Sequence, residues 1–364
     1  MKQTKFKKIM YVPSLNLGVI WWRIENYANA LVRSQKDWVV HVNYLVDPEK
    51  DVAWEKLVNL ENEIGELIRQ KLEATFQMFD FIIFQKIQYK EALDQIEILR
   101  KKYPKVKIIA EVDDSIGDVS ISTPYKFKHH LRDAAYHCIM SDAIITTTPY
   151  LADSIRSIVG KDKPIHIAPN CIDHGNWEIK NRPKKSKDLR IGYVGGGGHD
   201  EDLELAFRGL LPIIENDKNL KLIIRYGGFR PDYLRYHEQI DFKQVNWHPS
   251  VYAQKLTDMN LDLALVPLRD SSFNRCKSAI KWLEWASIDV PVIASKLEAY
   301  KGLKDIFYVD QYDKWNIELK KTIEIIKKNK KNKKKAFKNL YLKAREIFNI
   351  EKEAKKLLDF LVKI

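Results

Sequence analysis

Short apolar runs rich in β-branched and aromatic residues alternate with amphipathic helical patterns along almost the whole chain. A first series of predicted strands covers 8–14, 38–45, 79–85, 107–112, 143–147 and 165–168. A second series covers 189–194, 221–226, 245–247, 261–266, 290–294 and 306–309. Parallel strands need long crossover connections, usually helices, so this alternation is typical of parallel α/β sheets.

A polar stretch at 181–188, containing Lys and Pro, separates the two series of strands. The chain has 364 residues, which is more than one hydrophobic core usually organises. We therefore predict two Rossmann-like, doubly wound α/β domains, 1–172 and 187–335, that face each other across a cleft. In such sheets ligands bind outside the carboxyl ends of the strands, so a ligand is expected there.

The cysteine pattern and the N-terminus bear on where the protein works. The three cysteines, Cys138, Cys171 and Cys276, have no short paired spacing, so we expect neither a disulfide framework nor a zinc site. The apolar run at 9–12 ends at Pro13 and is too short for a signal peptide or an anchor. We expect a cytoplasmic protein.

The formal net charge of +13 is concentrated near the C-terminus. The segment 320–345 holds twelve Lys or Arg residues against one acid, Glu324, and so contributes +11 of this charge. Such a segment, with apolar residues between the cations, favours peripheral docking on an anionic membrane surface. A lysine-rich helix that only faces solvent explains the same pattern, and the sequence leaves both interpretations open.

The segment 273–295 carries the most chemical information. It runs from a polar loop with Arg275 and Lys277, through a helical pattern containing Glu284, into an apolar strand. Cations at a sheet edge favour an anionic ligand such as a pyrophosphate, and a carboxylate can accept hydrogen bonds from vicinal sugar hydroxyls. The segment therefore indicates a nucleotide-sugar site.

This segment resembles the donor site of GT-B glycosyltransferases of the family-4 type, whose pattern is K-S-x-x-K-x-x-E-x-x-x-x-x-x-P-V-(V/I)-A-S. The residues in register are Lys277, Ser278, Lys281, Glu284, Pro291 and Ser295. Cys276 stands where the family has a second acid that usually contacts the donor sugar. The phrase 167–173 is similar to the interdomain PNGID element, with Cys171 replacing glycine. The resemblance implies that the last helix, about 348–364, packs back on the N-terminal domain, which would hold the acceptor.

The donor-binding candidates lie in the second half of the chain. The four glycines at 195–198 follow a predicted strand and precede a helical pattern that begins near Asp200, so their amides can approach a phosphate closely. Lys277 is our first candidate for stabilising the leaving diphosphate. The full predicted donor set is Gly195, Gly196, Gly197, His199, Arg275, Lys277, Ser278 and Glu284. A flexible turn, a solvated lysine and a Glu284–Lys281 salt bridge are the structural alternatives.

Acceptor-side candidates lie at the ends of strands in the first half. Gly18 and Arg23 follow the first strand and resemble the family's glycine loop and cleft-facing arginine, although a structural salt bridge explains Arg23 equally well. Asp113 and Asp114 end the fourth strand and are candidates for the catalytic acceptor side, or for capping the next segment. Their pattern is not D-x-D, so we expect no catalytic metal and no other cofactor.

The leading hypothesis is a glycosyltransferase that moves a sugar from a nucleotide diphosphate, such as a UDP-sugar, to a hydroxyl acceptor. The resemblance implies retention of anomeric configuration without a metal. The acceptor is a glycan, a glycolipid or a nucleic acid. A nucleotide-sugar epimerase of the same fold, a DNA-modifying glycosyltransferase and a non-catalytic binding protein stay open as alternatives.

Overall fold

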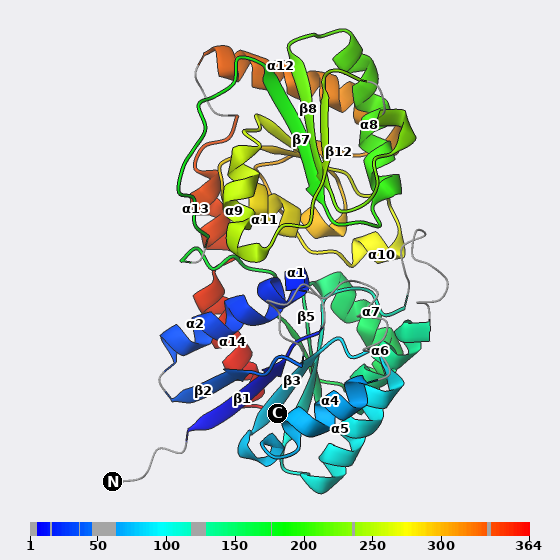
Figure 1. Ribbon diagram of the computed structural model, residues 1–364, viewed down its shortest axis with the longest axis vertical. Helices are drawn as coiled ribbons and strands as arrows, with labels where there is room; N and C mark the ends of the chain where they lie inside the picture. Colours follow the sequence, from blue (N-terminus) through cyan, green and yellow to red (C-terminus); the bar gives the residue numbers. More distant parts are fainter. Residues whose placement is uncertain are drawn as a thin grey trace. The chain divides into compact units, whose positions relative to one another are not determined.

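The computed structural model describes residues 6–14, 17–35, 37–45, 63–117, 129–175, 177–234, 237–332 and 336–364. The described residues form two compact units (Figure 1). The first unit comprises the described residues up to Asp173 together with Asn349–Ile364, and the second comprises the described residues of His174–Phe348. Each unit contains one six-stranded, wholly parallel sheet, as the alternation of strands and helices predicts.

The sheet of the first unit has the order β2-β1-β3-β4-β5-β6. Its strands are β1 (Lys7–Val12), β2 (Trp38–Val42), β3 (Phe81–Gln85), β4 (Lys107–Val112), β5 (Ala143–Thr146) and β6 (Ile165–Ile167). Its helices are α1 (Leu17–Ile20), the π-helical turn η1 (Trp21–Glu25), α2 (Asn26–Ser34), α4 (Ile64–Leu72), η2 (Phe76–Met78), α5 (Lys90–Lys102), α6 (His129–Met140), α7 (Pro149–Val159) and α14 (Ile350–Leu361). The central strand β3 is buried on both faces, which explains its unbroken apolar sequence.

The C-terminal helix α14 belongs to the first unit, although the second unit precedes it in the chain. The side chain of Asn349, the residue before this helix, caps it by accepting a hydrogen bond from the Lys352 amide at 2.8 Å. Its buried stripe, which includes Ile350, Leu357 and Leu361, recurs at helical spacing. Helix α14 packs against α2, while α4 and α5 pack together in the core on the other face of the sheet.

The sheet of the second unit has the order β12-β11-β10-β7-β8-β9. Its strands are β7 (Leu189–Gly195), β8 (Leu220–Tyr226), β9 (Ile240–Gln244), β10 (Leu263–Val266), β11 (Val292–Ser295) and β12 (Phe307–Val309). Its helices are α8 (Asp200–Glu215), η4 (Asp232–Leu234), α9 (Pro249–Asp258), α10 (Ser272–Arg275), α11 (Ile280–Ala286), η5 (Glu298–Tyr300), η6 (Tyr312–Lys314), α12 (Trp315–Lys331) and α13 (Leu340–Ile347). Numbered within this unit, the strand order is 3-2-1-4-5-6, which is the Rossmann order.

Helices α8 and α12 cover one face of this second sheet, and α9 and α11 lie on the other (Figure 1). The two helices α8 and α12 approach each other closely at Gly209. A Cβ atom at this glycine would lie 2.8 Å from the backbone nitrogen of Asn316, so a larger residue does not fit. The Asn316 side chain instead donates a hydrogen bond to the Gly209 carbonyl oxygen at 2.7 Å.

One strand prediction is wrong in position. The sequence analysis places a strand at 245–247, whereas β9 occupies Ile240–Gln244, directly before it. Strand β9 lies at the edge of the sheet and exposes several of its polar residues, so its sequence lacks a continuous apolar run. The apolar residues Val245 and Trp247 instead lie in the loop that leads into α9.

The strand order reverses between β7 and β10, because the chain continues outward to β8 and β9 on one side and to β11 and β12 on the other. The loops that leave β7 and β10 therefore start side by side at the carboxyl edge of the sheet. A crevice at such a reversal is where open α/β sheets hold their ligands. The glycine loop at 195–198 and the cationic segment at 267–279 are these two loops.

Candidate functional site

The glycine loop at 195–198 packs against a second glycine pair at the end of β8. The Gly227 amide donates a hydrogen bond to the Gly195 carbonyl oxygen at 2.9 Å. A Cβ atom at Gly227 would lie 2.9 Å from the Gly197 nitrogen, so the two loops require glycine to come this close. Gly198 adopts a positive φ of 87°, a conformation that glycine accepts without strain.

Gly196 differs from Gly195 and Gly198, because nothing among the described residues requires glycine at this position. A Cβ atom there would meet no atom within 4 Å, and its φ is not in the left-handed region. The space beside Gly196 is open, so a ligand can approach the backbone amides at this point of the loop.

The first turn of α8 carries three acids directly after the glycine loop, and each has a partner. The Tyr226 hydroxyl donates to Asp200 at 3.0 Å, Arg269 pairs with Glu201 at 2.8 Å, and His199 Nδ1 lies 2.8 Å from Asp202 Oδ2. Acids at a helix N-terminus are stabilised by the helix dipole. The sequence analysis considers only the glycines and His199, and so overlooks this acidic turn.

The cationic loop after β10 is anchored at several points. The Leu268 amide donates to Ser295 Oγ at 2.9 Å, and the Arg269 amide donates to Asp202 Oδ1 at 2.7 Å. Helix α10 then forms one turn, capped by Ser271, whose hydroxyl accepts from the Asn274 amide at 3.1 Å. The predicted polar loop is thus partly helical and is bonded to the end of β11 and to the first turn of α8.

The two cations of this loop have different surroundings. Arg275 forms two bonds to the Asp270 carboxylate, at 2.5 and 2.7 Å, so its guanidinium is neutralised locally. The Lys277 ammonium lies 4.3 Å from the centroid of the Phe273 ring, a cation–π contact. Ser278 follows at the start of the turn into α11, and the Cys276 side chain between the cations is buried. The two cations thus lie in different settings, Arg275 beside a carboxylate and Lys277 over an aromatic ring.

Glu284 is buried in α11 and is held by two donors. Its side chain is 2% exposed; Lys281 donates to Oε2 at 2.9 Å and the Tyr252 hydroxyl donates to the same oxygen at 3.1 Å. Burial and the Glu284 carboxylate raise the pKa of the Tyr252 hydroxyl, which keeps it a donor. The predicted salt bridge with Lys281 is present, and Tyr252 is a partner that the sequence analysis misses.

A buried tyrosine connects the two acidic parts of the second unit. Burial raises the pKa of the Tyr300 hydroxyl, and the carboxylates of Asp202 and Glu284 raise it further. Asp202 on α8 and Glu284 on α11 therefore both act on the same side chain.

Arg23 in the first unit is a buried structural cation. Its Nε donates to Glu111 at 2.7 Å, and its Nη1 donates to the Ala168 carbonyl oxygen at 2.7 Å and to Asn170 at 3.0 Å. The Arg23 and Glu111 side chains are 1% and 2% exposed. Burial raises the pKa of the Glu111 carboxyl, although the charge of Arg23 opposes that shift. Arg23 thus joins η1 to β4 and to the segment after β6, as the salt-bridge alternative describes.

Asp113 and Asp114 lie at the end of β4 beside Lys86, which follows the neighbouring strand β3. The Lys86 ammonium is 3.9 Å from Asp113 and 3.6 Å from Asp114. Burial lowers the pKa of Lys86, but the carboxylates of Asp114, Asp113 and Glu111 together raise it above its usual value. The sequence analysis misses Lys86, although the adjacency of β3 and β4 would have placed it near the two acids.

Three further expectations concern Gly18, metal ions and membrane-spanning helices. Gly18 lies in the short helix α1, so the predicted glycine loop after β1 is wrong at this residue. Among the described residues, no group of three or more His, Cys, Asp or Glu side chains is arranged to hold a metal ion. No helix within the described ranges is long and apolar enough to cross a membrane.

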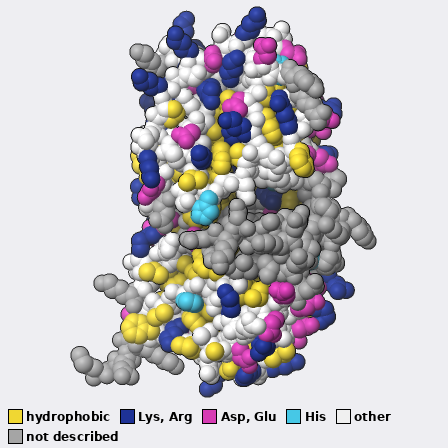
Figure 2. Space-filling model, viewed as in Figure 1, with side chains coloured by type: hydrophobic (Ala, Val, Ile, Leu, Met, Phe, Trp, Pro, Cys, Tyr) yellow, Lys and Arg dark blue, Asp and Glu magenta, His cyan; other side chains and the backbone are white. Residues whose placement is uncertain are grey.

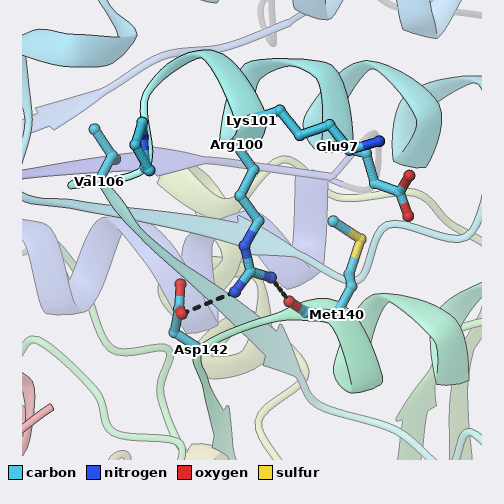
Figure 3. A pocket seen from close by; sticks show the side chains of 7 residues that line it. Glu97, Arg100, Lys101, Val106, Met140 and Asp142 are labelled. Atoms are coloured by element: carbon cyan, nitrogen blue, oxygen red, sulfur yellow. Dashed lines mark hydrogen bonds and ion pairs between the residues drawn. The ribbon is translucent and has the colours of Figure 1, made fainter.

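A pocket of about 420 Å³ lies at the opposite edge of the first sheet (Figure 3). It is lined by Glu97, Arg100, Lys101, Pro104, Val106, Met140 and Asp142. Within the pocket wall, Arg100 donates hydrogen bonds to Asp142 at 3.0 Å and to the Met140 carbonyl oxygen. Its guanidinium group is therefore held by residues that line the pocket. Val106 and Asp142 directly precede β4 and β5, which places this pocket at the amino ends of the strands, away from the candidate residues.

Comparison with solved structures shows which fold this is. The chain is similar to sucrose-phosphate synthase from Thermosynechococcus elongatus, with a TM-score of 0.69 at 13% identity over 98% of this chain and 99% of that one. It is similar to HepE from Anabaena, solved in complex with UDP-glucose, with a TM-score of 0.66 at 12% identity over 98% and 100%. A Listeria monocytogenes protein described as a UDP-N-acetylglucosamine 2-epimerase has a TM-score of 0.55 at 12% identity over 97% and 95%.

These likenesses confirm the predicted two-domain, Rossmann-like fold class, known as GT-B. No protein-family model matches the chain, and a search of curated proteins finds no relative. Because the identities are 12 to 13%, the comparison establishes the fold alone.

The open space beside Gly196 leads to a direct test. Gly196→Ala should leave the unfolding temperature unchanged or slightly higher, since the methyl group meets no atom and restricts the unfolded chain by about 0.4–1 kcal/mol. If a diphosphate approaches the loop here, the same methyl group should weaken nucleotide binding at least about tenfold, a cost of about 1.4 kcal/mol. Calorimetric titration and thermal unfolding measure the two effects.

Gly198→Ala is the matched control, because its positive φ disfavours alanine and should lower stability by about 1–2 kcal/mol. Wild-type affinity in Gly196→Ala would show that no ligand group comes close to this glycine.

Proposed function

We propose that the protein is a nucleotide-sugar-dependent glycosyltransferase. The observation that carries this proposal is the convergence of the glycine loop and the Lys277 loop, which leave adjacent strands where the order of the second sheet reverses. One loop offers backbone amides with open space, and the other offers an ammonium group. Together they form a surface that fits a diphosphate.

The central role is proposed for Lys277, which follows helix α10 in the cationic loop. Three acids in the first turn of α8 would repel a diphosphate, but Arg269 pairs with Glu201 and His199 with Asp202. Arg275 is held by Asp270. Lys277 then supplies the cation on which negative charge can develop as the sugar leaves, which stabilises the transition state more than the ground state.

Glu284 is proposed to bind the ribose of the donor. Lys281 and Tyr252 both contact its Oε2, so the second oxygen, Oε1, is the one proposed to accept hydrogen bonds from the ribose hydroxyls. The two internal donors hold the carboxylate in one orientation before a ligand arrives. A preorganised acceptor of this kind favours a vicinal diol over a deoxy sugar.

Asp113 and Asp114 are proposed to serve the acceptor side. The Lys86 ammonium lies within 4.0 Å of both carboxylates, which are proposed to orient or deprotonate the acceptor hydroxyl. We also propose, from the resemblance to the family-4 type, that transfer retains anomeric configuration and needs no metal. The epimerase alternative would use the same donor site without an acceptor.

The first test is nucleotide binding. UDP, GDP, ADP and dTDP at millimolar concentration should include at least one that raises the unfolding temperature, because a ligand that binds only the native state stabilises it. Lys277→Ala should weaken that binding about tenfold or more, since a hydrogen bond to a charged group contributes about 1.5–3 kcal/mol. Lys296→Ala is the control, because this exposed lysine pairs with Asp310 on the surface of the same unit.

Activity then separates the candidate functions. With the matching nucleotide sugar, a glycosyltransferase releases the nucleoside diphosphate and forms a glycoside, also in the presence of EDTA if no metal is needed. An epimerase converts the sugar while the nucleotide stays attached. If none of the four nucleotides changes the unfolding temperature of the wild type, the proposed donor site is contradicted.

The basic segment 320–345 is proposed to face an anionic membrane through the outer face of α12. This face carries Ile317 and Ile325, which are 50% and 45% exposed, among the exposed residues Lys320, Lys321, Lys328 and Lys331. Other cations of the segment stabilise the second unit itself: Lys327 pairs with Asp217, Lys330 with Asp262 and Lys343 with Asp305. Residues 333–335 lie outside the described ranges.

The distribution of charged side chains gives less support to the nucleic-acid alternative. On the face drawn in Figure 2, Lys and Arg side chains are dispersed among Asp and Glu side chains and do not form one continuous stripe. A groove that follows a phosphate backbone needs such a stripe. The exposed face of α12, with two isoleucines between lysines, is better suited to a lipid surface.

Replacing Lys320, Lys321, Lys328 and Lys331 with Gln should reduce co-sedimentation with phosphatidylserine vesicles at least about tenfold, because each cation contributes about 1 kcal/mol near an anionic surface. Nucleotide binding should be unchanged. The control replaces four exposed lysines elsewhere, Lys101, Lys105, Lys161 and Lys255. Wild-type protein that ignores these vesicles but retains duplex DNA, with affinity falling steeply as salt rises, would contradict the lipid surface and favour a nucleic-acid acceptor.

A further inference from the structure

We infer that Asp202 is a positioning residue: it holds the loop that carries Lys277 against the end of the glycine loop. The inference rests on the proposed function, because Lys277 matters only if that loop meets a ligand. The proposed diphosphate site gives the Asp202 carboxylate no role in binding, whereas this inference gives it a structural role. An acid this close to a diphosphate would otherwise only repel it.

Three donors from two separate loops converge on the Asp202 carboxylate. Its Oδ1 accepts from the Arg269 amide at 2.7 Å and from the Asn274 side-chain amide at 3.0 Å. Its Oδ2 lies 2.8 Å from His199 Nδ1, which directly follows the glycine loop. One side chain on the first turn of α8 thus ties the cationic loop to the glycine loop.

Asp202 differs from its neighbours on the same turn in burial and in partners. Its side chain is 7% exposed, whereas that of Glu201 is 38% exposed and pairs only with the Arg269 guanidinium. Asp200 accepts a hydrogen bond from the hydroxyl of Tyr226, which lies at the end of β8 and not in the cationic loop. Among these three acids, Asp202 is the one bonded to the backbone of the cationic loop. A buried carboxylate with three donors is strongly held, so it makes a rigid anchor.

The anchor reaches Lys277 through Asn274. The Asn274 side chain donates to Asp202 and also to the Arg269 carbonyl oxygen at 3.0 Å, which closes the loop on itself. The Asn274 carbonyl oxygen in turn accepts from the Lys277 amide at 3.2 Å. Two hydrogen bonds therefore separate the Asp202 carboxylate from the backbone of Lys277. Loss of the carboxylate should leave the donors of the loop without their acceptor and release α10 from its position.

The chain contains its own reporter for this release. Cys276 lies between Asn274 and Lys277, and its side chain is 1% exposed. The other two cysteines, Cys138 and Cys171, are buried in the first unit. A thiol reagent therefore reacts with Cys276 when the cationic loop opens, while Cys138 and Cys171 report on unfolding of the first unit. The denaturant dependence of Cys276 labelling separates loop opening, which exposes little surface, from unfolding of the second unit.

The experiment compares Asp202→Ala, Asp202→Asn and the control Glu201→Ala by thiol labelling, with the modified cysteine located by mass spectrometry. Asp202→Ala should accelerate labelling of Cys276 at least about tenfold and leave Cys138 and Cys171 unchanged. Asp202→Asn should stay within about threefold of wild type, because its amide oxygen can still accept from Arg269 and Asn274. Glu201→Ala removes the same charge from the same turn without touching the loop backbone, so it should label like wild type.

Nucleotide affinity tests the link to Lys277 with a double-mutant cycle. Asp202→Ala should weaken nucleoside diphosphate binding at least about tenfold in the wild-type background but less than about twofold in the Lys277→Ala background, because a displaced lysine and a missing lysine are equivalent. Equal losses in both backgrounds would contradict the positioning role.

Thiol labelling needs no ligand. It therefore tests whether Asp202 holds the cationic loop even if the proposed function is wrong. A wild type that binds none of the nucleotides contradicts the proposed function, whereas unchanged Cys276 labelling in Asp202→Ala contradicts the anchor. Labelling that rises equally at all three cysteines shows that Asp202 stabilises the whole protein and does not hold this loop, and it too overturns the inference.

Discussion

The reversal of strand order between β7 and β10 decides where the second unit can hold a ligand. Because the sheet grows outward in both directions from this pair, the loops after β7 and β10 leave side by side and are not covered by a crossover between them. The glycine loop, Lys277 and the acidic turn of α8 all lie on these two loops or directly after them. Their chemistry depends on this topology, because 78 to 81 residues of sequence separate the glycine and lysine positions.

Electrostatic compensation is the second constraint on the site. Asp200, Glu201, Asp202 and Asp270 surround loops that are proposed to receive a diphosphate, which acids alone would repel. Two of these acids pair with cations, Glu201 with Arg269 and Asp270 with Arg275, while Asp202 contacts the His199 ring and Asp200 accepts from the Tyr226 hydroxyl. The bonds from the cationic loop to Asp202 are the ones inferred to hold that loop in position. These contacts surround the loop that carries Lys277, the cation proposed to meet the ligand.

Much of this organisation could be predicted from the sequence, because α/β periodicity is a local property. The two parallel sheets and the placement of Gly195 at the end of β7 follow from apolar runs and glycine chemistry. The predicted strand at 245–247 is wrong because the edge strand β9 has no apolar run. The predicted loop at Gly18 is wrong because no local signal marks the start of the short helix α1. The partners Tyr252, Lys86 and Asp202 depend on which strands become neighbours, and periodicity does not report that.

The central claim is that a nucleotide sugar binds where the loops after β7 and β10 meet. Amide hydrogen exchange with and without UDP-glucose, or with whichever nucleotide sugar stabilises the protein, tests it directly, because it locates bound ligand along the chain. We predict slower amide exchange at residues 195–203 and 267–284 when the ligand is bound, with exchange at residues around 97–107 and 140–142 unchanged. Protection confined to those latter residues, which line the pocket at the opposite edge of the first sheet, would contradict it.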